Sequence, residues 1–207
     1  MVIGTFSDIE ARQELQKDKW ELIRFPRSVT ERADYIRRVK KATRFPFNYI
    51  ATFKSSRGNR YKVILTPTDK KKGAANPLLS VFTSLDKKEG TYILRYDMVT
   101  EHVSIFTPHF FKRYRERFLK DEALSSEEVR DKFLLRNFNI TVKDKMADET
   151  VGTCLDGYIF IRNKDRNTSV NVTFYSPDML TEEQRNNRAD LLQAIKKHEE
   201  KVLNFEE

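Results

Sequence analysis

The fold is decided by residues 49–66, whose sequence is YIATFKSSRGNRYKVILT. Residues 49–54 and 60–66 are rich in β-branched and aromatic side chains, which favour extended strands. Between them, Arg57-Gly58-Asn59 has the composition of a tight turn, because glycine and asparagine accept backbone angles that other residues avoid. We therefore predict a β-hairpin here.

The same pattern recurs on the C-terminal side of this hairpin. Apolar and β-branched runs alternate with short polar turns such as Asp86–Gly90 and Asn163–Asn167. Further strands are predicted at residues 78–85, 91–96, 103–106, 158–162 and 169–175.

Helices are predicted on both sides of the strands. Ser7 with Glu10, and Ser125 with Glu128, have the spacing of a capping box. Pro108 follows a capping threonine, and proline suits the first helical position because its missing N–H is not needed there. We expect an α+β protein with a predominantly antiparallel sheet, two N-terminal helices, two central helices and one C-terminal helix. The helices are placed at residues 7–26, from 28 or 30 to 44, 108–120, 125–138, and from 176 or 181 to 203.

The length of 207 residues fits one large domain or two small ones. We expect residues 1–102 to hold the helical pair and the hairpins. Residues 103–207 are expected to form a helix-helix-hairpin-helix module, either separate or packed with the first part as one domain.

The charge balance limits the class of partner. The chain has 39 Lys and Arg against 31 Asp and Glu, which gives a net charge of +8. This surplus suits a nucleic-acid partner, and surplus surface lysine is the alternative explanation. The single cysteine, Cys154, excludes an internal disulfide and, with only three histidines, leads us to expect no metal and no cofactor. We expect a reducing, cytoplasmic location.

Other classes are excluded by missing motifs. No apolar run approaches the roughly 20 residues of a membrane span, and residues 1–6 are too short for a signal-peptide core. We therefore expect no membrane partner. Gly58 and Gly73 are isolated, so the sequence has no phosphate-cradling loop of the Walker or dinucleotide type.

Candidate site residues lie on the helix that follows Pro108. At about 100° per residue, His109, Arg113, Glu116 and Arg117 share one side of this helix, opposite a side of Phe and Tyr residues. Guanidinium groups bind phosphate oxygens and stabilise a pentavalent transition state, and an imidazole moves protons near neutral pH. This residue set suits a phosphodiester substrate.

Simpler interpretations of the same helix remain open. Glu116 is either a general base or a carboxylate that holds an arginine in place. The whole face is also typical of a solvated helix surface, in which Glu116 pairs with Lys112 or Arg113 for a few tenths of a kcal/mol, and plain phosphate binding without catalysis is the third interpretation.

The spacing His109, Arg113, Glu116 and Arg117, followed by a capped helix at Ser125 and a strand ending in Val172-Thr173-Phe174-Tyr175, resembles the barnase/EndoU/colicin/RelE superfamily of metal-independent ribonucleases. The resemblance covers residues 103–180. It implies acid–base and phosphate-binding roles for the matching residues. These are His109, Arg113 and Arg117 on the helix, with Thr173 and Tyr175 on the strand.

A second basic region lies nearer the N-terminus. Basic residues within 37–44 and 57–72 alternate with Tyr35, Phe45, Phe47, Tyr49 and Tyr61, a composition that suits an aromatic-lined surface for a single strand. Two functional hypotheses follow from these observations. One is a toxin-like, metal-independent endoribonuclease that uses the helix after Pro108. The other is a non-catalytic basic module that binds nucleic acid or a partner protein in the cytoplasm.

Overall fold

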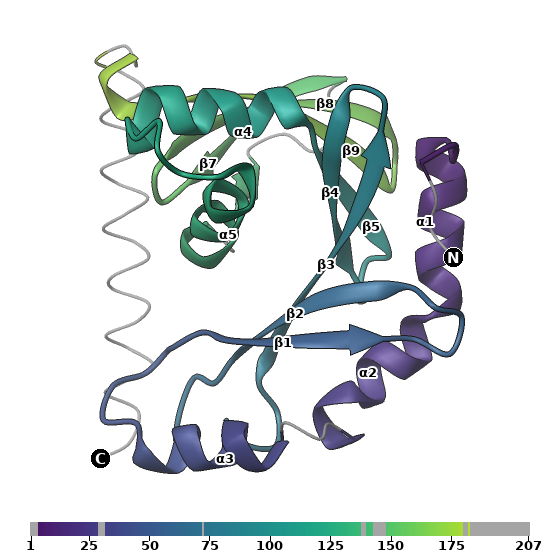
Figure 1. Ribbon diagram of the computed structural model, residues 1–207, viewed down its shortest axis with the longest axis vertical. Helices are drawn as coiled ribbons and strands as arrows, with labels where there is room; N and C mark the ends of the chain where they lie inside the picture. Colours follow the sequence, from purple (N-terminus) through teal and green to yellow (C-terminus); the bar gives the residue numbers. More distant parts are fainter. Residues whose placement is uncertain are drawn as a thin grey trace. The chain divides into compact units, whose positions relative to one another are not determined.

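The computed structural model describes residues 4–28, 32–71, 73–137, 140–142, 148–179 and 182. This part of the chain contains five α-helices and a nine-stranded, mostly antiparallel sheet (Figure 1). The predicted α+β class is therefore confirmed. The strand order is β1-β2-β3-β4-β5-β9-β8-β7-β6.

The first five strands form an antiparallel meander. Both predicted hairpins are confirmed, the first by the pairing of Tyr49 with Leu65 through Lys54 with Arg60. Gly58 and Gly90 in the two turns have φ angles of 84° and 122°, which only glycine adopts without strain. The bounds are β1 Tyr49–Lys54, β2 Arg60–Thr66, β3 Leu78–Lys87, β4 Gly90–Asp97 and β5 His102–Phe106.

The remaining strands join this meander through a parallel pair, in which Val103 of β5 lies opposite Thr168 of β9. Two of these strands, β6 and β7, lie between the predicted helix at 125–138 and the predicted strand at 158–162, where no strand was predicted. Gly152 interrupts the β-branched pattern of β7, and a Cβ at this position would lie 2.7 Å from Ile161 Cδ1, the end of a side chain. The bounds are β6 Thr141–Val142, β7 Glu149–Cys154, β8 Gly157–Asp165 and β9 Thr168–Tyr175.

The described helices are α1 Asp8–Lys17, α2 Lys19–Ser28, α3 Arg32–Lys41, α4 Pro108–Tyr114 and α5 Ser126–Arg136. Both predicted capping boxes are present, at Ser7 with Glu10 and at Ser125 with Glu128. A 3₁₀ turn, Pro177–Met179, lies at the expected start of the C-terminal helix. The rest of that predicted helix falls outside the described residues, apart from residue 182.

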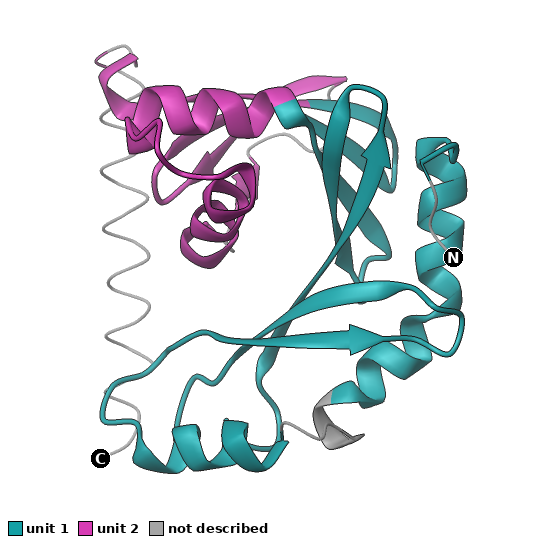
Figure 2. Ribbon diagram, in the orientation of Figure 1, with its two compact units in different colours: residues 1–108, 162–172 teal, residues 109–161, 173–207 magenta. Residues whose placement is uncertain are grey.

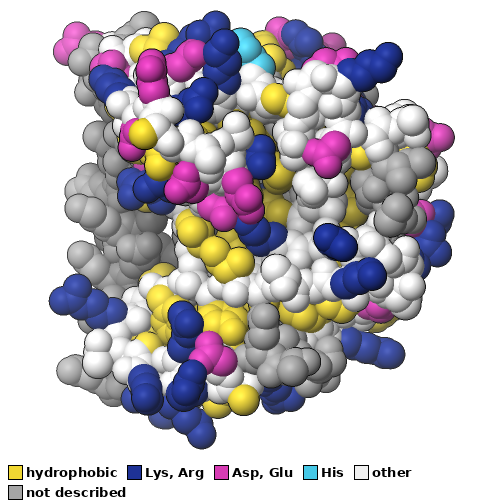
Figure 3. Space-filling model, viewed as in Figure 1, with side chains coloured by type: hydrophobic (Ala, Val, Ile, Leu, Met, Phe, Trp, Pro, Cys, Tyr) yellow, Lys and Arg dark blue, Asp and Glu magenta, His cyan; other side chains and the backbone are white. Residues whose placement is uncertain are grey.

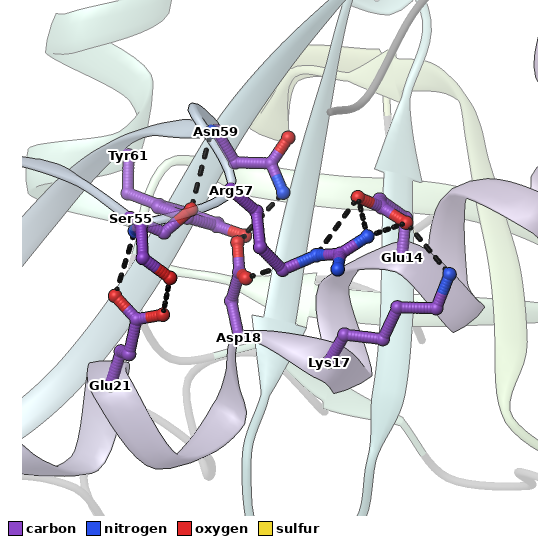
Figure 4. A network of polar contacts seen from close by, with 9 residues as sticks. Glu14, Lys17, Asp18, Glu21, Ser55, Arg57, Asn59 and Tyr61 are labelled. Atoms are coloured by element: carbon purple, nitrogen blue, oxygen red, sulfur yellow. Dashed lines mark hydrogen bonds and ion pairs between the residues drawn. The ribbon is translucent and has the colours of Figure 1, made fainter.

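The expected helix over residues 7–26 is divided into α1 and α2 at Asp18, and α2 continues past Pro26 to Ser28. The Asp18 carboxylate is fully buried, and its Oδ2 accepts hydrogen bonds of 2.7 Å from Asn59 Nδ2 and Tyr61 Oη (Figure 4). Both donors belong to the region of the first hairpin. Asp18 Oδ1 makes no hydrogen bond within the described residues and lies 3.6 Å from Arg57 Nε. The break therefore coincides with a buried carboxylate whose tertiary contacts the sequence pattern does not reveal.

The chain divides into two compact units (Figure 2). Unit 1 comprises residues 1–108 and 162–172, and unit 2 comprises residues 109–161 and 173–207. The predicted module boundary near Val103 stays a prediction.

In unit 1, helices α1–α3 cover one face of the meander. Apolar side chains from these helices interlock with every second residue of β1–β5, as the two-residue period of a strand requires. The buried cluster includes Leu15, Leu22, Tyr35, Val39, Val63, Val81, Leu94, Tyr96 and Val103.

Unit 2 is organised by a cluster of aromatic rings. Phe133 of α5 packs against Phe110 and Tyr114 of α4, with ring centroids 4.9 and 5.0 Å apart. Phe174 of β9 lies 5.1 Å from Tyr114 in an edge-to-face arrangement. All four rings are fully buried, so they fix the orientation of α4 within the unit.

Candidate functional site

The predicted site on α4 is positioned by the aromatic cluster of unit 2. Because Phe110, Phe111 and Tyr114 face the interior, the intervening positions of α4 face outward. Arg113 Nε donates to His109 Nε2 at 3.4 Å, and Arg113 Nη1 donates to Glu116 Oε2 at 2.9 Å. The structure therefore brings three of the predicted site residues into one chain of contacts.

The helix widens directly after α4, and Glu116 and Arg117 lie in the widened turn. Residues Arg115–Leu119 form a π-helical turn, in which the Lys120 N–H donates to the Arg115 carbonyl at 2.8 Å. Such turns are rare and often lie at functional sites. The wider turn directs Arg117 to β9, where its guanidinium donates to the Phe174 carbonyl and lies 5.5 Å from the Tyr175 ring centroid.

The five predicted site residues thus fall into two groups, His109-Arg113-Glu116 and Arg117-Tyr175. A wheel with uniform 100° steps does not predict this division, because a π turn adds a residue to the helix. Thr173 lies on β9, two residues before Tyr175.

The negative charge of Glu116 partly neutralises the positive charges on this outward helix face. Glu116 pairs with Arg113 and lies 3.9 Å from Lys112 Nζ, as the solvated-face interpretation expects. The Arg113 and Glu116 side chains are 37% and 39% exposed, so this pair adds little to stability. His109 is exposed beside a guanidinium, an arrangement that can bind a phosphate and move a proton.

A second group of cations is gathered on α3 and the loop that follows it, within unit 1. Tyr35 and Val39 are buried and fix α3, which leaves Arg37 and Arg38 with side chains 66% and 64% exposed. Both arginines pair with Asp34, and the Arg38 guanidinium lies 5.2 Å from the centre of the Tyr49 ring. A shared carboxylate and an aromatic ring therefore orient these guanidinium groups.

The surface beside α3 is hollowed. Two adjoining hollows with volumes of about 550 and 490 Å³ share Asp34 and Arg38. In Figure 3, Lys and Arg side chains gather over α3 next to hydrophobic side chains. We call this surface the basic depression; its lining residues are Asp34, Arg37, Arg38, Lys41, Ala42, Thr43, Arg44, Phe47, Asn48, Tyr49 and Ile50.

Four cations and one carboxylate line the basic depression, and Lys41 and Arg44 make no ion pair within the described residues. Part of the predicted aromatic lining is present as well, since Phe47 and Tyr49 line the hollows and the Phe45 ring lies 5.6 Å from Phe47. Tyr35 and Tyr61 are each 2% exposed and belong to the core, and the Tyr49 ring is also largely buried, at 7% exposed. Their burial was not visible in the sequence, because an alternating basic and aromatic pattern does not show which side chains face inward.

Asp34 was not identified from the sequence. Asp34 lies three residues before Arg37 and four residues before Arg38, which is the spacing of helical ion pairs. This spacing is the sequence signal by which Asp34 could have been identified. For a metal ion, the described residues offer no cluster of three or more His, Cys, Asp or Glu side chains.

No family model, curated protein or solved structure matches this chain. None of the helices in the described ranges has the length and apolar character needed to cross a bilayer.

Proposed function

We propose that this protein binds single-stranded nucleic acid, in the first instance RNA, through the basic depression. The observation that supports this proposal is the excess of cations there: Arg37, Arg38, Lys41 and Arg44 surround a single carboxylate. Phosphate groups supply the matching negative charge, and guanidinium groups bind phosphate oxygens in a two-pronged geometry.

The aromatic residues favour a single strand over a duplex. The half-buried Phe47 ring lines the depression with the half-buried Phe45 ring 5.6 Å away, and accessible rings bind unpaired bases by stacking, which is tolerant of sequence. The Tyr49 ring is buried and contributes by its contact with Arg38. Bases in a duplex are already stacked on one another and do not present their faces. The Arg38–Tyr49 contact also holds one guanidinium in place before any ligand binds.

The first test replaces the two cations of the depression that have no ion pair. In Lys41→Gln/Arg44→Gln, we expect the affinity for a labelled RNA of about 12 nucleotides to fall by about tenfold, because two phosphate contacts are lost. Fluorescence anisotropy measures this affinity. The matched control is Lys88→Gln/Lys164→Gln, which removes the same charge from exposed positions outside the depression. Equal affinities for the two double variants would contradict the proposal, and a partner protein would then become the better candidate for this surface.

Metal-independent RNA cleavage at α4 is a second candidate function. It is favoured by the direct contact between the exposed His109 imidazole and the Arg113 guanidinium, which pairs a proton-transfer group with a phosphate-binding group. Among the predicted residues, Glu116 orients Arg113, and Arg117 with Tyr175 forms the second group.

The cleavage candidate has a direct test. With mixed RNA in EDTA, we expect the wild-type protein to yield fragments with 2′,3′-cyclic phosphate ends and His109→Ala to yield none, as read on a denaturing gel. Thermal stability should be equal in the two proteins because His109 is exposed. Intact RNA in both reactions would leave binding as the proposed function of the chain.

A further inference from the structure

An acidic side chain lies where the two hollows of the basic depression meet. Asp34 and Arg38 are the two residues that line both hollows. The Asp34 side chain is 32% exposed, so a ligand in either hollow can reach it. A carboxylate repels phosphate groups, and Asp34 therefore weakens a phosphate-binding surface unless it contacts another part of the ligand.

The Asp34 carboxylate still has room for one more hydrogen-bond donor. Its Oδ1 accepts a hydrogen bond from Arg37 Nη2, and its Oδ2 accepts from Arg38 Nε at 3.0 Å and from Tyr49 Oη at 3.4 Å. An ionised carboxylate has about four lone-pair sites, so these described residues leave one site on Oδ1. The hydrogen bond from Arg37 and the charges of both arginines hold the pKa of Asp34 below its ordinary value of 3.8. At neutral pH Asp34 is thus an acceptor and never a donor.

A single strand of RNA offers two kinds of donor to such an acceptor. One is the ribose 2′-hydroxyl, which lies beside the phosphate of its own nucleotide link. The other is the set of base N–H groups, which lie on edges turned away from the backbone. Arg37 and Arg38, the guanidiniums proposed to hold phosphates, both bind the Asp34 carboxylate directly. A phosphate on either arginine therefore brings a ribose to Asp34, and this position favours the 2′-hydroxyl over a base.

We propose that Asp34 accepts a hydrogen bond from a ribose 2′-hydroxyl and thereby makes the basic depression select RNA over single-stranded DNA. This inference rests on the proposed function and deepens it, because it names the part of the nucleotide that is recognised. A DNA strand lacks the hydroxyl and leaves the carboxylate beside its phosphates without a hydrogen bond in return. The same residue therefore attracts RNA and disfavours DNA.

Three strands of about 12 nucleotides test this selection by fluorescence anisotropy: oligouridine, oligodeoxyuridine and 2′-fluoro-oligouridine. All three carry the same base, so base recognition does not enter the comparison. We expect the wild-type protein to bind oligouridine about tenfold more tightly than oligodeoxyuridine, the effect of one hydrogen bond to a charged group. The 2′-fluoro strand keeps the sugar shape of RNA but has no donor, so it should bind like the deoxy strand.

Two variants of Asp34 assign the preference to its carboxylate. In Asp34→Ala the ratio of RNA affinity to DNA affinity should fall to about one, because the acceptor is gone. Asp34→Asn should keep a preference of about threefold, since its amide oxygen still accepts and a neutral hydrogen bond is about half as strong. Glu89→Ala is the matched control, because it removes an exposed carboxylate of the same unit outside the depression. The control should keep the wild-type ratio.

The fold of Asp34→Ala is checked by circular dichroism, and we expect it to match wild type because the ion pairs of Asp34 are partly exposed. If Asp34→Ala shifts the RNA and DNA affinities by the same factor, Asp34 only orients the arginines and the proposal is overturned. Binding of the 2′-fluoro strand as tight as that of oligouridine would assign the preference to sugar shape and contradict it as well.

The failure of this inference differs from the failure of the proposed function. A wild-type protein that binds RNA and DNA equally refutes the role of Asp34, while weaker RNA binding by Lys41→Gln/Arg44→Gln still supports the depression as the binding surface. If that double variant binds RNA as its control Lys88→Gln/Lys164→Gln does, the depression is not the binding surface and both proposals fail.

Discussion

Asp156→Ala should lower the free energy of unfolding by about 3–5 kcal/mol, because it leaves two buried donors without an acceptor and removes the carboxylate that binds the half-exposed Arg136. Asp156 is 1% exposed and accepts from Tyr114 Oη at 2.6 Å and from Asn137 Nδ2 at 2.9 Å. Arg136 binds the same carboxylate through Nε and Nη2 at 2.9–3.1 Å. These contacts tie α4 and α5 to the turn between β7 and β8.

Urea unfolding of the full-length chain, followed by circular dichroism, measures this loss. Glu122→Gln is the matched control, because Glu122 is an exposed carboxylate of the same unit and its replacement should change stability by less than about 0.5 kcal/mol. A loss below about 1 kcal/mol for Asp156→Ala would show that the buried contacts do not hold the unit together.

The same residue predicts an acid dependence of stability. Burial alone would raise the pKa of Asp156, but the hydrogen bonds from Arg136, Tyr114 and Asn137 outweigh it and hold the pKa below the ordinary value of 3.8. A carboxylate with a lowered pKa contributes stability that is complete above its unfolded pKa and is lost as the pH falls toward its folded pKa. The wild type should therefore lose stability below about pH 4 more steeply than Asp156→Ala.

Asp18→Ala should have the second-largest effect, a loss of about 2–4 kcal/mol. The substitution leaves two buried donors, Asn59 Nδ2 and Tyr61 Oη, without an acceptor. It also removes the carboxylate that lies 3.6 Å from Arg57 Nε (Figure 4). Burial and the Asp18 contact raise the pKa of Tyr61, so this phenol stays a proton donor in the native state.

The experiment compares Asp18→Ala with Glu89→Gln, an exposed carboxylate in the turn between β3 and β4 of the same unit. In urea unfolding monitored by circular dichroism, the free energies of unfolding of the two variants should differ by at least about 2 kcal/mol. Equal midpoints would mean that the break between α1 and α2 does not depend on this network.

Local patterns in the sequence predicted the elements whose causes are local. The turn glycines predicted both hairpins of the meander, and the capping boxes at Ser7 and Ser125 predicted two helix starts. Features with distant causes were missed. The carboxylate of Asp18, at the break, contacts Asn59 and Tyr61, about 40 residues away, and β7 was hidden because Gly152 interrupts its β-branched pattern.

In the candidate sites, too, features with local causes were predicted and features with distant causes were missed. The contact between His109 and Arg113 lies within one helix, so the i, i+4 spacing was enough to predict it. The π turn redirected Arg117, and no residue in the sequence marks it.

The salt dependence of RNA binding tests the central claim most directly. If the four cations of the basic depression contact phosphates, a plot of log Kobs against log[KCl] for wild-type protein and a 12-nucleotide RNA should have a slope of about −3. The slope should be about −1.4 in Lys41→Gln/Arg44→Gln, since each contact contributes about −0.7. A wild-type slope near zero, or the same slope in both proteins, would contradict nucleic-acid binding at this surface.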